Sequence, residues 1–204
     1  MKMHSFSSGW SYAHADKNEP LQPVLIPHDA MLLEPRHPDN TGGGNVCWFG
    51  GGEYRYEKRF TVPAEWEKQH ITLEFEGVYR HAEVLINGQK AGGCAYGFYI
   101  NADPYLRYGV ENVVEVLAHN ADHPNSRWYS GAGIYRPVNL YSGPQAYIHP
   151  NGVKLKTQSI DPAVVEVTAR VQGEGIVKAE ILWHGQVVTA NEGKAVNDTA
   201  QFSS

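Results

Sequence analysis

Apolar and polar side chains alternate along this chain in short runs with a period of two residues, as in residues 71–76, 82–87, 114–118 and 165–171. Because successive side chains of a β-strand point to opposite faces of a sheet, this period indicates strands with one buried face. Helical periodicity is nearly absent, and only the stretch after Pro63 predicts a turn or two of helix. Gly, Pro and Asn punctuate the runs, and Asn87-Gly88 predicts a tight hairpin turn. We therefore predict an all-β protein built as an antiparallel sandwich.

The aromatic residues divide the chain into two parts. Most of the 5 Trp, 12 Tyr and 6 Phe residues precede residue 142, and only Tyr147, Trp183 and Phe202 follow it. The change falls in the Gly- and Pro-containing segment 142–152, which is typical of a domain boundary. We predict one domain at residues 1–145 and a second at 146–204. The second has room for three or four strands, so it is either a small sheet docked on the first domain or, as we favour, an unfinished sandwich.

Charge and composition exclude several classes of function. The chain has 17 Lys+Arg against 22 Asp+Glu, a net charge of −5, so we expect no nucleic-acid partner. No apolar run is long enough for a membrane span, and the first 20 residues lack the apolar core of a secretion signal. Cys47 and Cys94 match no zinc or redox motif. We expect both to be reduced and the protein to be cytoplasmic.

Four stretches, in a fixed order, together resemble a known family. They are Pro27-His28-Asp29, GGGEYRY at 50–56 leading to Phe60, FEGVYRHAEVLINGQKAGG at 75–93, and SRWYSGAGIYR at 126–136. In this order and at these intervals, residues 6–145 resemble the N-terminal sugar-binding domain of family 2 glycoside hydrolases. That family contains β-galactosidases, β-glucuronidases and β-mannosidases, and the likeness is greatest to a β-galactosidase.

The resemblance implies an architecture of three parts: a jelly-roll β-sandwich, an immunoglobulin-like β-sandwich and a catalytic (β/α)8 barrel. Residues 146–204 look like the opening strands of the second part, and nothing in the chain looks like the barrel. In the family, the general acid/base and the nucleophile are two glutamates of the barrel. We therefore expect no catalytic residue in this chain and no hydrolase activity from it alone. The dipeptides Asn18-Glu19 and Asn191-Glu192 imitate the family's Asn-Glu pair, but they lie in a polar stretch and in a predicted turn.

Three residues are candidates for contact with a sugar. Trp48 lies between two Gly-Gly-Gly clusters, in a loop that either packs on a neighbouring domain or lines a sugar cleft. By resemblance, Asn120 and Asp122 belong to a loop that projects toward the barrel and can supply polar groups to the sugar pocket. Their alternative interpretation is a plain turn. For His28 we predict a structural hydrogen-bonding role.

Metal binding by this chain is not expected. Asn120 and Asp122 carry oxygen ligands of the kind that hold Mg²⁺ or Na⁺, which occur in some family galactosidases, so such an ion is possible in the full-length enzyme. His119 and His123 are four residues apart, but Pro124 and the Asn- and Asp-rich context indicate a loop rather than a helical metal site.

The leading hypothesis is the non-catalytic N-terminal region of a retaining β-galactosidase-like glycosidase. Its partners would be the catalytic barrel, the carbohydrate substrate of the whole enzyme and, at the open strand edges, a second copy in a homo-oligomer. The alternative is a free-standing carbohydrate-binding module, which would need a flat or grooved aromatic face within residues 48–135 and affinity for sugar in isolation.

Overall fold

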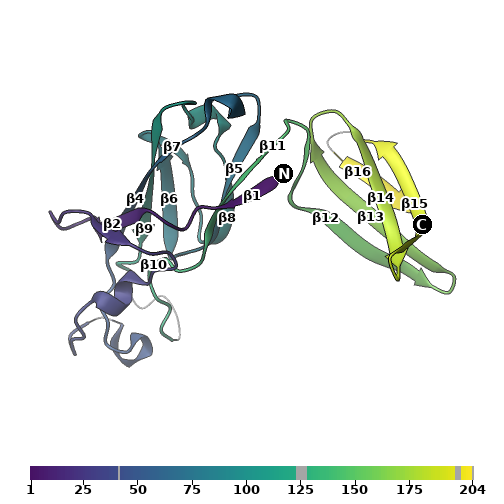
Figure 1. Cartoon of the computed structure of the whole chain (residues 1–204). Coiled ribbons are helices and arrows are strands. Elements are labelled where there is room, and N and C mark those ends of the chain that lie inside the picture. Colours follow the sequence, from purple (N-terminus) through teal and green to yellow (C-terminus); the bar gives the residue numbers. More distant parts are fainter. Residues whose placement is uncertain (41, 123–127, 196–198, 204) are drawn as a thin grey trace. The chain divides into compact units, whose positions relative to one another are not determined.

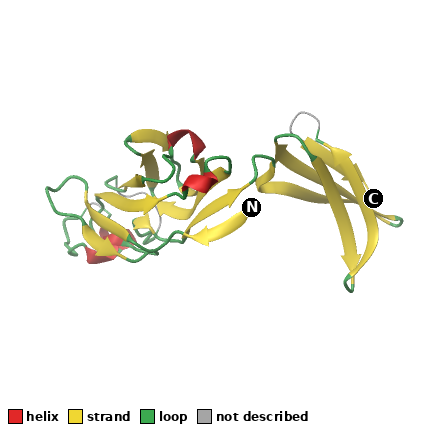
Figure 2. Ribbon diagram, turned by 45° about the horizontal axis from the view of Figure 1, so that its top comes forward, coloured by secondary structure: helices red, strands yellow, loops and turns green. Residues whose placement is uncertain are grey.

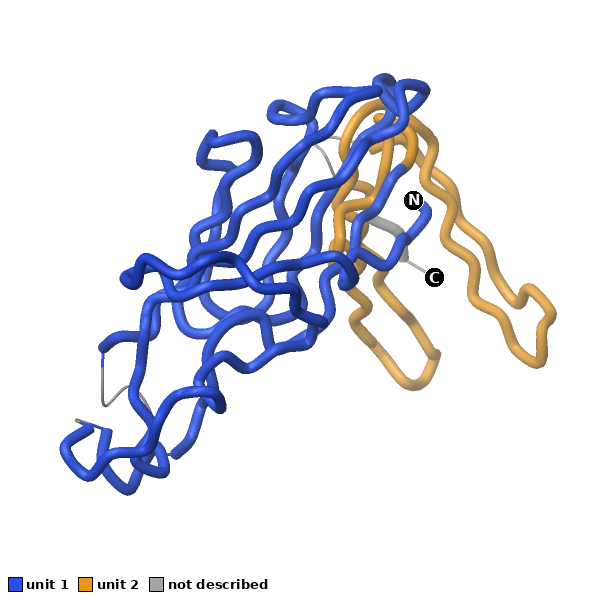
Figure 3. The backbone as a smooth tube through the Cα atoms, turned by 60° about the vertical axis from the view of Figure 1, so that its left-hand side comes forward, with its two compact units in different colours: residues 1–142 blue, residues 143–204 orange. Residues whose placement is uncertain are grey.

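The computed structural model describes residues 1–40, 42–122, 128–195 and 199–203. Strands and loops make up nearly all of it, which confirms the predicted all-β fold (Figures 1 and 2). The chain forms two compact units, Met1–Ser142 and Gly143–Ser204 (Figure 3). None of the helices in the described part of the chain is long and apolar enough to cross a lipid bilayer.

The part of unit 1 that the structure describes forms a five-stranded and a six-stranded sheet. The five-stranded sheet has the order β1-β11-β5-β10, with β8 also paired to β5; its strands are β1 (Lys2–Ser5), β11 (Val138–Gly143), β5 (His70–Tyr79), β10 (Gly133–Ile134) and β8 (Tyr96–Asn101). The six-stranded sheet has the order β3-β2-β4-β9-β6-β7; its strands are β3 (Gln22–Val24), β2 (Trp10–His14), β4 (Glu53–Thr61), β9 (Glu111–His119), β6 (His81–Ile86) and β7 (Gln89–Gly92).

The alternating side chains of both sheets meet in one core. Leu73 and Phe75 of β5 pack with Val114 and Val116 of β9 in a single buried cluster. This agrees with the two-residue period of the sequence, because every second side chain of a strand faces the same side of its sheet. Asn87-Gly88 closes the β6–β7 hairpin with φ angles of 52° and 76°, which confirms the predicted turn.

Short 3-10 helices occur only in connections of the described chain. They are η1 (Ala30–Leu33), η2 (Gly43–Val46), η3 (Ala64–Trp66) and η4 (Asp103–Tyr105). The predicted turn of helix after Pro63 is η3. Two of the others, η1 and η2, lie in the long connection between β3 and β4, which the strand pattern leaves without a regular element.

The described residues of unit 2 form five strands in two sheets. β12 (Tyr147–Ile160), β13 (Ala163–Gln172) and β16 (Thr199–Ser203) form one sheet, and β14 (Ile176–Trp183) pairs with β15 (Gln186–Lys194) in the other. The prediction of three or four strands is therefore too low. The buried cluster of this unit is small and comprises Ala169, Val171, Val177 and Ala200.

Candidate functional site

Connections from distant parts of the sequence meet at one end of unit 1, which we call the loop end (Figure 1). It comprises residues 25–40, 42–52, 120–122 and 128–137. The backbone groups of Gly52 and Asn120 exchange hydrogen bonds of 3.2 and 2.9 Å, and Ala30 donates to the Ala132 carbonyl at 3.0 Å. These bonds hold the β3–β4 and β9–β10 connections side by side.

The Asp29 carboxylate is the central polar group of the loop end. Its Oδ1 accepts hydrogen bonds from the backbone N–H groups of Met31 at 3.1 Å and Ala132 at 2.9 Å. Its Oδ2 accepts a short hydrogen bond from the Tyr129 hydroxyl. Gly131 has a φ of 71°, and a Cβ atom added there would lie 2.7 Å from Oδ2, so any other residue would be strained at that position and would displace the carboxylate. Asp29 therefore caps η1 and fixes the segment 129–132 against it.

His28 has the structural hydrogen-bonding role that the sequence predicts. Its Nδ1 is 2.8 Å from the hydroxyl of Tyr56, and its ring centre lies 4.4 Å from that of Tyr12. Its backbone N–H donates to the Ile134 carbonyl at 2.8 Å. Burial lowers the pKa of His28, and the attraction of the Asp29 carboxylate opposes this change only in part. A neutral imidazole at this position favours a fixed hydrogen bond over a pH-dependent charge.

Trp48 has a fixed backbone and an exposed side chain. Its φ of 65° lies in the left-handed region, its N–H donates to the Gly43 carbonyl at 2.9 Å, and its carbonyl accepts from Asn40 Nδ2 at 2.8 Å. The indole lies over the backbone of Gly43 and Gly44, because a Cβ atom added at either glycine would be within 4 Å of the ring. Trp48 as a whole is 42% exposed. Trp48 therefore offers a held aromatic surface to a ligand or to another domain.

Neighbouring side chains attach the Trp48 loop to the rest of the loop end. Arg36 Nε donates to the Cys47 carbonyl at 2.7 Å, and the Arg36 guanidinium lies 5.5 Å from the centre of the Phe49 ring. The Phe49 ring in turn packs at 5.7 Å against Tyr129, which binds Asp29. Through this chain of contacts the Trp48 loop and the Asp29 carboxylate belong to one packed structure.

The structure separates the two polar candidates. Asn120 is 1% exposed, and its Nδ2 donates to the Gly131 carbonyl at 3.1 Å, so its side chain joins two parts of the loop end. Asp122 is exposed, and its backbone carbonyl accepts a hydrogen bond from Arg80 at 3.4 Å. The contact of Asn120 or Asp122 with a sugar stays a prediction, and in this structure Asp122 is the more accessible of the two.

The histidine pair considered as a metal site is only partly within the described chain. His119 Nδ1 is hydrogen-bonded to Glu53 Oε2, whereas His123 lies outside the described residues. Within residues 1–40, 42–122, 128–195 and 199–203, no group of three or more His, Cys, Asp or Glu side chains is placed to hold a metal ion.

A second polar cluster, which joins Glu34 of the loop end to strands β2 and β4, is not predicted by the sequence. The Glu34 carboxylate, at the end of η1, lies 3.0 Å from His14 Nε2 and accepts a hydrogen bond from the Tyr54 hydroxyl at 3.3 Å. Tyr54 and Tyr56 are inward-facing residues of β4 and are fully buried. The sequence signal that could have predicted this cluster is the pair of tyrosines at alternate positions of a core strand, because buried hydroxyls require hydrogen-bond partners.

These tyrosines predict a specific pH dependence of stability. Burial raises the pKa of Tyr54 and Tyr56, and the Glu34 carboxylate raises that of Tyr54 further. Because both pKa values in the folded state lie above the unfolded value of about 10, the stabilisation that depends on the protonated hydroxyls is complete below pH 10. It is lost as the pH rises above 10, by up to about 1.4 kcal/mol per pH unit for each group. We expect part of the tyrosinate absorbance to appear only together with loss of β-sheet circular dichroism. Ionisation of all tyrosines while the fold persists would contradict this.

Comparison with known proteins identifies the family of unit 1. Residues 28–127 match the family model described as the glycosyl hydrolase 2 galactose-binding domain-like domain. That segment includes the Asp29 carboxylate, the Trp48 loop and strands β4 to β9. The chain carries the galactose-binding domain-like domain of glycosyl hydrolase family 2. The resemblance found in the sequence is thereby confirmed.

Curated relatives in glycosyl hydrolase family 2 extend the likeness over both units. The β-galactosidase BoGH2A of Bacteroides ovatus is 32% identical over 95% of this chain and 24% of its own length. A putative β-glucuronidase of Formosa agariphila is 31% identical over 72% of this chain and 15% of its own length. This chain therefore spans a quarter or less of the length of these two relatives.

A solved structure supports the fold assignment. A glycosyl hydrolase family 2 member from Bacteroides cellulosilyticus covers 100% of this chain with 30% of its own, at a TM-score of 0.83 and 22% sequence identity. At this identity the likeness concerns the fold alone. It agrees with a galactose-binding domain-like sandwich as the first unit of the family 2 architecture.

Proposed function

We propose that this chain is the non-catalytic N-terminal region of a retaining β-galactosidase-like glycosidase. The observation that carries the proposal is the similarity to a β-galactosidase along 95% of the chain, at 32% identity, together with the small share of that relative that is matched. The region positions the catalytic barrel and borders the substrate cleft. A β-glucuronidase-like activity is the second candidate, because relatives with that name match parts of the same chain.

The loop end supports the positioning role. It exposes the large apolar side chains of Leu32, Leu33, Trp48 and Trp128, with exposed fractions between 42% and 66%. Apolar groups exposed on a rigid frame gain free energy when another domain covers them. We propose that the catalytic barrel packs here, with Trp48 either inside that contact or at the edge of the sugar cleft.

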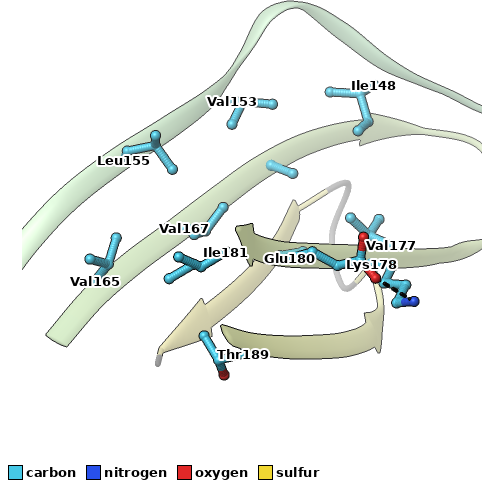
Figure 4. A pocket seen from close by; sticks show the side chains of 12 residues that line it. Ile148, Val153, Leu155, Val165, Val167, Val177, Lys178, Glu180, Ile181 and Thr189 are labelled. Carbon is cyan, nitrogen blue, oxygen red and sulfur yellow. Dashed lines mark ion pairs between the residues drawn. The ribbon is translucent and has the colours of Figure 1, made fainter. Parts of the chain in front are cut away.

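Unit 2 supports the proposal that it is the first part of an immunoglobulin-like sandwich. A groove of about 470 Å³ lies between its two sheets and is lined mainly by apolar side chains (Figure 4). Among these, Ile148, Val153 and Leu155 of β12 are between 44% and 71% exposed. Further strands of a longer protein would cover them.

The two cysteines are free, which supports a reducing, cytoplasmic location.

The test is activity of the chain with and without its continuation. We expect no turnover of nitrophenyl β-galactoside or β-glucuronide by the 204-residue chain. The protein encoded by the extended reading frame should hydrolyse one of them with retention of configuration. Turnover by the short chain would contradict the proposal, and so would the lack of a (β/α)8 barrel in the extended protein.

Trp48→Ala in the extended protein separates the two roles of Trp48. If the indole lines the sugar cleft, KM rises several-fold while the unfolding temperature hardly changes. If it lies in the domain contact, the unfolding temperature falls and KM is retained. The control is Trp183→Ala, because Trp183 is also an exposed tryptophan but lies in unit 2.

A further inference from the structure

A row of polar and aromatic side chains crosses three adjacent strands of unit 1, on the outer face of the five-stranded sheet. It consists of Tyr99 on β8, Glu74 and Glu76 on β5, and Asn139 and Tyr141 on β11. We call these five residues the tyrosine–carboxylate strip. None of them belongs to the loop end, and their neighbours on the same strands, such as Phe75 and Phe98, face the core.

Hydrogen bonds hold the strip in one arrangement. Tyr99 is directly opposite Glu74 in the β5–β8 register, and its hydroxyl donates to Glu74 Oε1 at 2.6 Å. The Tyr141 hydroxyl donates to Glu74 Oε2 at 2.9 Å. Asn139 Nδ2 donates to Glu74 Oε2 at 2.9 Å and to Glu76 Oε1 at 3.0 Å. The two aromatic rings are therefore fixed on either side of one carboxylate, which removes most of the entropy cost of ordering them on binding.

The protonation states of Glu74 and Tyr141 at neutral pH favour the same arrangement. Burial alone would raise the pKa of Glu74, but the hydrogen bonds from Tyr99, Asn139 and Tyr141 outweigh it and lower the pKa. Burial and the bond to Glu74 raise the pKa of Tyr141 to about 12. At neutral pH the carboxylate is thus an ionised acceptor and the phenol a donor.

The chemistry of the strip matches a neutral carbohydrate. Tyrosine rings can bury the apolar face of a pyranose, and carboxylate oxygens accept hydrogen bonds from its hydroxyls. Glu76 is exposed and retains acceptor capacity beyond its bond from Asn139. Among the described residues, no Lys or Arg forms an ion pair with Glu74 or Glu76. Two carboxylates without a cation repel acidic sugars and phosphate groups, so a neutral ligand is favoured.

A cavity adjoins the strip at Tyr99. Its volume is about 430 Å³, and its lining includes Gly92, Gly93, Tyr99, Asn101 and Tyr105. This volume lies within the range of about 300–1,000 Å³ that is typical of small-molecule sites. Two tyrosines, an amide and glycine backbone give such a cavity the same mixture of apolar and hydrogen-bonding surface as the strip. Tyr99 belongs to both.

We propose that the tyrosine–carboxylate strip and the adjoining cavity form a binding site for a neutral oligosaccharide, with one sugar unit in the cavity beside Tyr99 and the next units over Glu74 and Tyr141. The site belongs to unit 1 itself and does not rest on the proposed glycosidase activity. It provides the aromatic face that a carbohydrate-binding module requires.

Titration of the 15N-labelled 204-residue chain with β-1,4-galactotriose tests the proposal. We expect saturable shifts of amide resonances in β5, β8 and β11 and around the cavity, with affinity in the millimolar range. A trisaccharide of the same size that contains glucuronic acid should bind at least threefold more weakly. The absence of saturable shifts with galactotriose would overturn the proposal, as would shifts confined to the loop end.

Variants locate the binding. Tyr99→Ala should weaken galactotriose binding at least tenfold, and Glu76→Gln about threefold. Tyr99→Phe keeps the ring and should retain most of the affinity even if it lowers stability, so it distinguishes lost stacking from lost folding. Trp183→Ala removes an exposed aromatic side chain of unit 2 and should leave binding unaltered. Equal affinity in wild type and Tyr99→Ala, or loss of binding in Trp183→Ala, would contradict the assignment to the strip.

Discussion

Replacement of Gly133 by alanine is expected to lower the free energy of unfolding of unit 1 by about 2–5 kcal/mol, through backbone strain and overpacking together. Gly133 lies in β10 with a φ of 93°, in the region that L side chains rarely adopt. An added Cβ atom would lie 2.0 Å from the hydroxyl oxygen and 2.9 Å from Cζ of Tyr56. Because Tyr56 is fully buried and hydrogen-bonded to His28, its ring cannot move aside without disturbing the loop end.

Gly88→Ala is the matched control for Gly133→Ala. Gly88 has a φ of 76°, but an added Cβ atom would meet no other atom within 4 Å. It therefore carries the backbone strain without the clash and should cost only about 1–2 kcal/mol. Urea unfolding followed by tryptophan fluorescence measures both variants. Equal losses in the two would show that packing against Tyr56 contributes nothing.

Removal of the Asp29 carboxylate is the second large effect that we expect. Asp29→Ala deprives the backbone N–H groups of Met31 and Ala132 and the hydroxyl of Tyr129 of their acceptor. Ala132 is fully buried, so its N–H would lose a partner away from water. Since hydrogen bonds to a charged acceptor contribute about 1.5–3 kcal/mol each, we expect a loss of about 3 kcal/mol or more.

The location of the effect distinguishes Asp29 from an ordinary surface acid. Amide hydrogen exchange at Met31 and Ala132 should accelerate by about a hundredfold, the equivalent of about 2.7 kcal/mol of local opening. Asp29→Asn keeps an oxygen acceptor and should recover most of the protection of both amides. Asp39→Ala is the control, because the Asp39 side chain is 89% exposed and should change neither measurement. Unchanged exchange at Ala132 in Asp29→Ala would refute the role of this carboxylate.

The local pattern of the sequence was sufficient to predict most of the strands and one turn. The residues that alternate in 71–76 and 114–118 are those that face each other in the core, because burial of one sheet face dictates a period of two. Asn87-Gly88 predicts its turn since both residues tolerate positive φ. The pairing of β16 with β13 was not predicted, because it joins segments that are far apart in the sequence.

The candidate sites could be predicted from the sequence only in part. The sequence singled out Trp48 by its glycine-bracketed loop, and its exposed indole agrees with both roles considered for it. It placed Asn120 and Asp122 together as polar loop residues, whereas one is buried and the other exposed. Glu74, Tyr99 and Tyr141 have no common motif, because they come from three separate strands.

By itself, the sequence determined the all-β class of this protein, its resemblance to glycosyl hydrolase family 2 and the loop that carries Trp48, because alternation, turn residues and short ordered motifs are local properties. Only the tertiary structure decided that Asp29 joins segments about a hundred residues apart, at a sequence separation of 103 to Ala132, and that two tyrosines flank Glu74 across neighbouring strands. The physical reason is that strand order and register bring such groups together, and neither is encoded in the spacing of the residues along the chain.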